Sequence, residues 1–428
     1  MGVDITITGL RGREIINGRG IPAVEVDLLT SDGKRHTASA PSGVSVSSHE
    51  AVELRDGGKR LMGKGVLAAV RNIEDSIRPA LLGKAVADQA GIDTLLIELD
   101  GTKQKTRLGG NAMTAVSLAV AKAGASSSGL EPYAWLGGPD ATRITLLCPN
   151  MLSGSKTAGN SLDFEDYLIV PHGFATLGEA VTASVETFHI LHRNLQRRYG
   201  LIPQITALAP PCKTSGEAMD FIVEAIAEAG YEGKIGLGID VAADNFHDRE
   251  TGLYNLQSGA VDRDGLIAHY AELSAAYPVV FWEDGLAEDD FEGFAAMTRA
   301  VPCLIVGDDL FATNPERLRR GAAMKAGNAM LLKVNQAGTV SEALAAGRVA
   351  TDAGYRVVAS VRSGETDDPV QADIAVAAGA LLMKAGAPLR GEMVGKYNRL
   401  TWIERELGTR ASFAGKDVSA ELKRASGI

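Results

Sequence analysis

Two periodicities of apolar residues divide the chain into an N-terminal and a C-terminal part. Residues 21–29 alternate apolar and polar side chains, as a half-buried strand does, and residues 35–40 can return beside them after the turn at 30–34. Apolar positions then follow a helical period in 65–82 and 110–123. We therefore expect residues 1–135 to form an α+β domain.

From residue 136 onward, short apolar runs alternate with Ala-rich segments of helical period. One strand with one helix and its loops occupies about the interval of 25 residues at which several of these runs recur. Repeated units of this kind form a parallel sheet that most simply closes into a barrel. The fold class is therefore α/β: an N-terminal α+β cap domain (1–135) and a C-terminal β/α barrel (136–428). The expected strands lie in 234–240, 278–284, 303–309, 329–336, 356–363 and 380–386.

Along the chain, the first three of these six runs end in carboxylates and the last three end in cationic residues. In an α/β barrel, the reacting groups come from the C-terminal ends of the strands. Side chains that merely solvate the barrel mouth are the alternative, but six strands in ordered blocks of charge favour a site. The strand-end residues are Asp240, Glu283, Asp308, Lys333, Arg362 with Ser363, and Lys384.

Three converging carboxylates require a cation, and hard oxygen ligands favour Mg²⁺. The absence of His and Cys at these positions argues against zinc. We expect the pKa of Lys333 to be lowered by Lys384 and Arg362, so that Lys333 can act as a base. A metal-bound substrate carboxylate would acidify the adjacent C–H, which Lys333 would then deprotonate.

Composition and net charge limit the kinds of molecule that the protein is expected to bind. The formal net charge of −10 disfavours nucleic acid and anionic lipid, and no apolar run is long enough to span a membrane. Three separated cysteines and an N-terminus without a signal-peptide pattern indicate a cytoplasmic protein. We therefore expect neither a nucleic-acid nor a membrane partner.

Residues 41–50 hold four serines, one Gly and one Pro, with no helical pattern. Such a segment suits a mobile loop over a polar ligand. A solvated connector between the domains is the alternative on composition alone.

Several motifs resemble the enolase (phosphopyruvate hydratase) family over nearly the whole chain. The resemblance implies an α+β cap on a barrel whose first strands are irregular. It also implies a homodimer or octamer, two Mg²⁺ ions, and interconversion of 2-phosphoglycerate and phosphoenolpyruvate. A small anionic phosphate or phosphonate is therefore the substrate that the resemblance implies. The matching segments include GREIINGRGIPAVEVD, IELDGTKQKTRLGGNA, EDGLAEDDFEGF, GDDLFATNPERL, LLKVNQAGTVSEAL and KYNRLTWIERELG.

The resemblance also implies roles for individual residues. Lys333 matches the base, and Lys384 matches the lysine that contacts the substrate carboxylate. Ser45, in the serine-rich loop, matches the serine that joins the second magnesium. The phosphate-binding pair matches Arg362 and Ser363, and the metal ligands match Asp240, Glu283 and Asp308.

The chain departs from the family where the leaving hydroxyl is handled. The acid Glu of the family's Gly-Asp-Glu-Gly-Gly motif falls on Ile205, and its glycines fall on Thr206 and Ala207. The partner Glu falls on Asp166, so Asp166 or Glu165 would have to supply the proton. Lys156 stands near the place of a family His and would suit a further anionic group.

These departures leave three functions open. The chain is expected to be a specialised, Mg-dependent enolase paralogue acting through an enediolate, such as a carboxyphosphonoenolpyruvate synthase of phosphonate and phosphinate antibiotic biosynthesis. An ordinary enolase that dehydrates 2-phosphoglycerate is one alternative. A non-catalytic binding protein on an enolase frame is the other.

Overall fold

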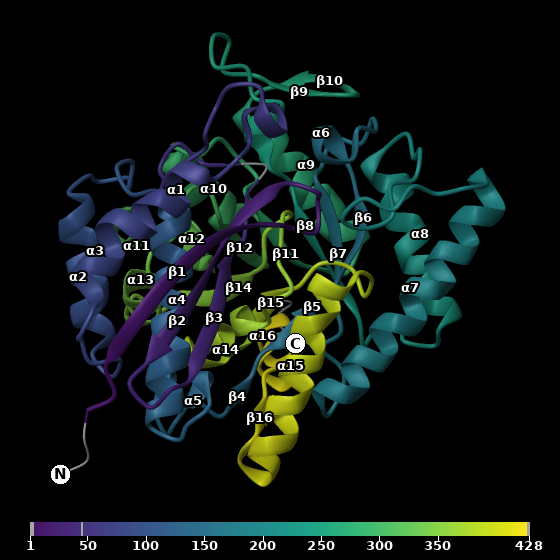
Figure 1. Ribbon diagram of the computed structural model, residues 1–428. Helices are drawn as coiled ribbons and strands as arrows, with labels where there is room; N and C mark the ends of the chain where they lie inside the picture. The colour runs from purple at the N-terminus through teal and green to yellow at the C-terminus, as the bar shows by residue number, and fades with distance from the viewer. Residues whose placement is uncertain (1–3, 44–45, 426–428) are drawn as a thin grey trace.

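The computed structural model describes residues 4–43 and 46–425, without the side chains of residues 156, 157 and 421–425. Its N-terminal part is an antiparallel sheet in the order β1-β2-β3 (Figure 1). The expected hairpin of β2 and β3 is confirmed, and Leu29 pairs with Arg35 beside the turn. β2 is buried along most of its length and not on one face only, because it is the central strand and α4 packs on it. The strands are β1 (Ile7–Ile16), β2 (Pro22–Thr30) and β3 (Arg35–Ala40).

Helices of the cap connect this sheet to the barrel. The helix expected in 65–82 consists of α1 (Leu67–Asn72), a π-helical turn (Ile73–Ile77) and α2 (Arg78–Leu81). The helix expected in 110–123 is α4 (Gly110–Ser127), which is buried on almost every side because it packs on the sheet and on α12 and α13. The expected domain boundary at 135/136 falls within α5 and stays a prediction. The remaining cap helices are α3 (Gln89–Asp100) and α5 (Pro132–Gly137).

The C-terminal part is a nine-stranded sheet that closes into a barrel. In the order β5-β15-β14-β13-β12-β11-β8-β7-β6, the two outermost strands are separated along the chain only by Pro149. β7 runs antiparallel to β6 and β8, and the other pairs are parallel. The α/β fold class is thus confirmed. The strands are β5 (Leu146–Cys148), β6 (Asn150–Ser153), β7 (Asp166–Val170), β8 (Gly236–Asp240), β11 (Val279–Glu283), β12 (Leu304–Gly307), β13 (Ala329–Leu332), β14 (Arg356–Ser360) and β15 (Leu382–Lys384).

The barrel helices surround these strands (Figure 1). Three of them begin with a Thr whose hydroxyl accepts from the backbone N–H of a Glu three residues later, as at Thr176 and Glu179. This Thr-x-x-Glu pattern satisfies backbone donors that a helix start leaves unpaired. The helices are α7 (Leu177–Tyr199), α8 (Ser215–Glu228), α9 (Arg263–Ala276), α10 (Phe291–Ala300), α11 (Pro315–Met324), α13 (Val340–Asp352), α14 (Val370–Ala377) and α15 (Gly391–Leu407).

Shorter elements complete the fold. Among the described residues, no helix combines the length and apolarity needed to cross a membrane. The shorter elements are β4 (Arg143–Ile144) paired with β16 (Ser412–Phe413), the hairpin of β9 (Tyr254–Leu256) and β10 (Gly259–Val261), and the helices α6 (Ser155–Ala158), α12 (Val334–Ala337) and α16 (Gly415–Ala425).

Candidate active site

A pocket at the C-terminal ends of the barrel strands gathers most of the residues singled out in the sequence. Parallel pairing aligns the strand ends, so that Asp240 of β8 lies beside Glu283 of β11. Glu283 is fully buried beneath the pocket. Ser45 lies outside the described residues, as does the side chain of Lys156. The expected residues that line the pocket are Glu165, Asp166, Asp240, Asp308, Lys333, Arg362, Ser363 and Lys384.

Lysines and carboxylates neutralise one another across the pocket. Lys384 Nζ lies 2.6 Å from Asp240 Oδ2 and 2.7 Å from both carboxylate oxygens of Glu283. Lys333 contacts Asp308. Burial and the neighbouring Asp240 raise the pKa of Glu283 well above its ordinary value. Burial also acts to raise the pKa of Asp308, but the Lys333 ammonium outweighs it and lowers that pKa.

The expected lowering of the Lys333 pKa was wrong for this structure. Burial does lower the pKa of the amine, and Arg362 and Lys384 act in the same direction. The contact with Asp308 outweighs these effects, so the pKa of Lys333 is raised. The sequence showed the cations at the strand ends but not that a carboxylate touches Lys333.

The oxygen donors of the pocket fit a hard divalent cation. Asp240, Glu283 and Asp308 offer only carboxylate oxygens, the ligand type that Mg²⁺ prefers. Asp284, Asp308 and Asp309 offer oxygens that lie within 4.8 Å of one another. Asp284 also accepts hydrogen bonds from the backbone N–H groups of Asp308 (2.9 Å) and Asp309 (2.7 Å) and thereby fixes the end of β12.

The wall formed by β6 and β7 differs from the family pattern. Asp166 lies at the start of β7 beside Asp240, and burial together with that neighbour raises its pKa to about 6. Glu165 accepts a hydrogen bond from Asn245 at 3.1 Å. Ile205 is not among the residues that line the pocket, and its carbonyl accepts a hydrogen bond from Arg390 at 2.5 Å. Thr206 lines the pocket next to it.

Arg362 has a partner that the sequence did not reveal. Its guanidinium pairs with Glu50 at 2.8 Å, and Glu50 also accepts from Gln336, which donates to Asp308 at 2.7 Å. A side chain at Gly43 would displace this guanidinium, since a Cβ there would lie 1.9 Å from Arg362 Nη2. Glu50 is visible in the sequence as part of the His-Glu pair that ends the serine-rich loop, but only the fold shows that it reaches Arg362, two residues after β14.

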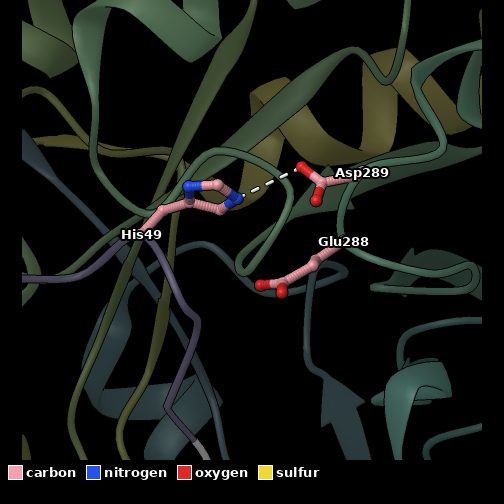
Figure 2. Close-up of side chains that lie close together, drawn as sticks. All are labelled: His49, Glu288 and Asp289. Carbon is pink, nitrogen blue, oxygen red and sulfur yellow. Dashed lines mark hydrogen bonds and ion pairs between the residues drawn. The ribbon is translucent and has the colours of Figure 1, made fainter.

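The end of the same loop is bound to the barrel by a group of side chains that we call the clasp, defined as residues 47–49 with Glu288 and Asp289. Figure 2 shows three of these residues, His49, Glu288 and Asp289. Glu288 accepts from Ser47 Oγ at 2.7 Å and from Ser48 Oγ at 2.9 Å. His49 Nε2 lies 3.1 Å from Asp289 Oδ1. Arg317 Nη1 lies within 2.9 Å of both His49 Nε2 and Asp289 Oδ1, so a cation already occupies this cluster.

Comparison with known proteins assigns the family. The family model "Enolase, N-terminal domain" matches residues 7–136, and "Enolase, C-terminal TIM barrel domain" matches residues 143–422. A protein named "Enolase" from Methanopyrus kandleri is 48% identical over 419 residues, which cover 96% of this chain and 98% of that protein. Proteins of the same name from Methanocaldococcus jannaschii and Pyrococcus furiosus are each 46% identical, over 96% of this chain and 97% of theirs. The chain is therefore a member of the enolase family of enzymes.

Proposed function

We propose that this enzyme interconverts 2-phosphoglycerate and phosphoenolpyruvate, with Lys333 moving the proton at C2. The observation that carries the proposal is the placement of Lys333 against Asp308 in a pocket that also holds Lys384 and Arg362. Relatives that match nearly the full length carry the name enolase, which favours this reaction over that of a specialised paralogue.

Asp240, Glu283 and Asp308 would hold Mg²⁺ in this account. A divalent cation supplies positive charge that stabilises the second negative charge of a deprotonated carboxylate substrate. Lys384 would bind the substrate carboxylate, and Arg362 with Ser363 would bind its phosphate as bidentate and hydroxyl donors. The ammonium form of Lys333, which Asp308 favours, is the form that returns a proton to C2 in the reverse direction.

Expulsion of the C3 hydroxyl requires a proton donor, because hydroxide is a poor leaving group. Ile205 has no proton to give, so Asp166 or Glu165 would take this role from the neighbouring strand. We assign it to Asp166, since that residue matches the partner acid of the family and lies on the pocket wall. Loss of a general acid typically costs about 10²- to 10⁴-fold in rate.

The apolar residue at 205 supports a second candidate. A specialised paralogue, such as a carboxyphosphonoenolpyruvate synthase, would use the same enediolate chemistry on a phosphoenolpyruvate-type substrate without needing hydroxide loss at the ordinary rate. Lys156 was the sequence feature in its favour, and its side chain is outside the described residues.

Two assays on the Mg²⁺-loaded enzyme separate these functions. Solvent deuterium exchange at C2 of 2-phosphoglycerate, followed by NMR, reports proton removal alone. Rising ultraviolet absorbance reports phosphoenolpyruvate and therefore the complete dehydration. Both signals at comparable rates support the enolase reaction. Exchange with only background dehydration would instead favour the paralogue, and the absence of both would reject the enediolate account.

A further inference from the structure

Three polar side chains stand on the pocket wall where the family acid is replaced. Asn150 and Ser153 come from β6, and Ser153 pairs with Asp166 of β7 across the two antiparallel strands. Thr206 is brought to them because the backbone N–H of Ser153 donates to the carbonyl of Leu208 at 2.8 Å. Asn150, Asp166 and Thr206 line the pocket, and Ser153 is fully buried behind them.

The directions of the hydrogen bonds on this wall follow from the number of available hydrogens. Asn150 Nδ2 donates to Asp166 Oδ1 at 2.5 Å, and Ser153 Oγ donates to the same oxygen at 3.0 Å. A serine hydroxyl carries one hydrogen, so Thr206 must be the donor in its 2.7 Å contact with Ser153 Oγ. The hydrogen of Thr206 is thus used inside the wall, which leaves its oxygen lone pairs as acceptors.

An unsatisfied acceptor lies in the same group. Asn150 is 3% exposed, and its Oδ1 has no hydrogen-bond partner among the described residues. A buried carbonyl without a donor costs free energy, so this wall holds more acceptors than donors. The wall therefore presents hydrogen-bond acceptors beside the carboxylates of Asp166 and Asp240. Such a surface favours a neutral ligand group that donates a hydrogen bond over an anionic group.

We propose that Asn150, Ser153 and Thr206 form a hydroxyl-binding subsite that holds the C3 hydroxyl of the substrate and disfavours a second anionic group there. The inference rests on the proposed function, because that function places C3 beside Asp166. Thr206 Oγ1 accepts the single hydrogen of the hydroxyl, and Asn150 and Ser153, which both donate to Asp166, position Asp166 and Thr206. Thr206 can take part only because this chain has a side chain where the family pattern has glycine.

Calorimetric binding to the Mg²⁺-loaded enzyme tests the subsite with three probes. They are 2-phosphoglycerate, 2-phospholactate (a methyl group replaces CH₂OH) and 2-phosphotartronate (a carboxylate replaces it). We expect 2-phosphoglycerate to bind tighter than either analogue by about tenfold or more, because a site built to bond a hydroxyl rejects ligands without one. Equal affinity for 2-phosphoglycerate and either analogue would overturn the proposal.

Thr206→Val and Thr206→Ser form a matched pair for the same titrations. The valine variant keeps the shape and loses the hydroxyl, so its preference for 2-phosphoglycerate should fall several-fold, whereas the serine variant should keep it. A preference unchanged in Thr206→Val overturns the subsite. If exchange at C2 persists in that case, the proposed function stands without the subsite. If the folded wild-type enzyme shows neither binding nor exchange, both the subsite and the proposed function are rejected.

Discussion

Asp166 is held by neutral donors, whereas Asp240 and Glu283 share the ammonium of Lys384. Burial and the neighbouring Asp240 raise the pKa of Asp166 to about 6, so this carboxyl can hold a proton near neutral pH. These different hydrogen-bond partners, together with the register of β7 beside β8, distinguish Asp166 as the expected acid from Asp240 and Glu283 as the expected metal ligands.

Asp166→Asn should separate the two halves of the reaction. The amide keeps the size of the side chain but has no acidic proton, so dehydration should fall by about 10²- to 10⁴-fold. Exchange at C2 should fall much less, because Lys333 is unchanged. Parallel absorbance and NMR measurements would check this, and an equal loss in both signals would remove the assignment of Asp166 to the leaving group.

The clasp joins the cap to the barrel. The chain segment that contributes its serines continues to Glu50, which lies beside Arg362 on the side of the pocket where we expect the phosphate. Glu288 lies on the barrel, Ser47 and Ser48 lie on the cap, and Glu50 of the same segment reaches Arg362. Because Glu288 is 7% exposed, its hydrogen bonds are made in an environment from which water is largely excluded.

The double variant Ser47→Ala, Ser48→Ala should raise KM for 2-phosphoglycerate more than it lowers kcat. Each lost hydrogen bond contributes ~1 kcal/mol, which corresponds to a rise of about 5- to 30-fold for one or two bonds. Steady-state kinetics measures the effect. Ser127→Ala, at the end of α4, is the control and should change neither constant. An unchanged KM in the double variant would contradict a role for the clasp.

His172 connects the barrel to the C-terminal helix, since its Nδ1 lies 2.9 Å from Ser419 Oγ of α16. Burial lowers the pKa of His172 below its ordinary value. The folded state therefore binds fewer protons than the unfolded chain at this residue. Its contribution to the free energy of unfolding is present above about pH 6.5 and is lost as the pH falls toward the lowered folded pKa.

Urea unfolding at pH 7.5 and pH 5.5 would check this contribution. Wild-type protein should lose more stability between the two pH values than His172→Gln, which has no group that titrates there. His36, whose pKa burial also lowers, remains in both proteins and cancels in the comparison. Identical losses in the two proteins would show that His172 does not drive the change.

The sequence predicted the elements that carry strong periodicity. All six parallel strands with charged ends were found, because buried β-branched runs and their terminal charges are local signals. The strand β1 and the antiparallel pairing of β7 do not follow from the periodicity, since they depend on distant segments, and the family resemblance implied only that the first barrel strands are irregular. The starts of α7, α8 and α13 are also encoded locally, in the pattern Thr-x-x-Glu.

The positions of the site residues at strand ends could be predicted from the sequence, whereas the side-chain partners of these residues could not. Asp240 and Lys384 end β8 and β15, as the strand pattern predicts. Their direct contact, and the contact of Lys333 with Asp308, join segments far apart in the chain, and the pattern does not predict them. Glu50 meeting Arg362 is a contact between the cap and the barrel that no spacing in the chain encodes.

At the scale of the whole molecule, the carboxylates of the pocket are already paired with Lys333 and Lys384 in the folded protein. Binding of a divalent cation should therefore add stability, but it should not be required for folding. Mg²⁺ at about 100 times its Kd should stabilise the enzyme by ~2.7 kcal/mol. Thermal unfolding with and without MgCl₂ would show a higher Tm with the ion, and Asp240→Asn should weaken the shift. A Tm independent of Mg²⁺ in the wild type would contradict a site in this pocket.

We also expect a homo-oligomer, as the family resemblance implies. β1 spans ten residues and, among the described residues, pairs with another strand along one edge only, and Ile16 at its end is 59% exposed. Unpaired edges with apolar side chains are surfaces that proteins commonly cover. Light scattering should give a multiple of 44.8 kDa. A mass of one chain at micromolar concentration would contradict the expectation.

The central claim is that Lys333 removes a proton from carbon in this pocket. The most direct measurement is deuterium incorporation at C2 of 2-phosphoglycerate in D₂O with Mg²⁺, comparing wild type, Lys333→Ala and Lys416→Ala. Lys416 is exposed on α16, which docks at the end of β7 remote from Asp166, so its variant should exchange at the wild-type rate. Exchange that is lost only in Lys333→Ala is the predicted result, and exchange that persists in that folded variant would contradict the account.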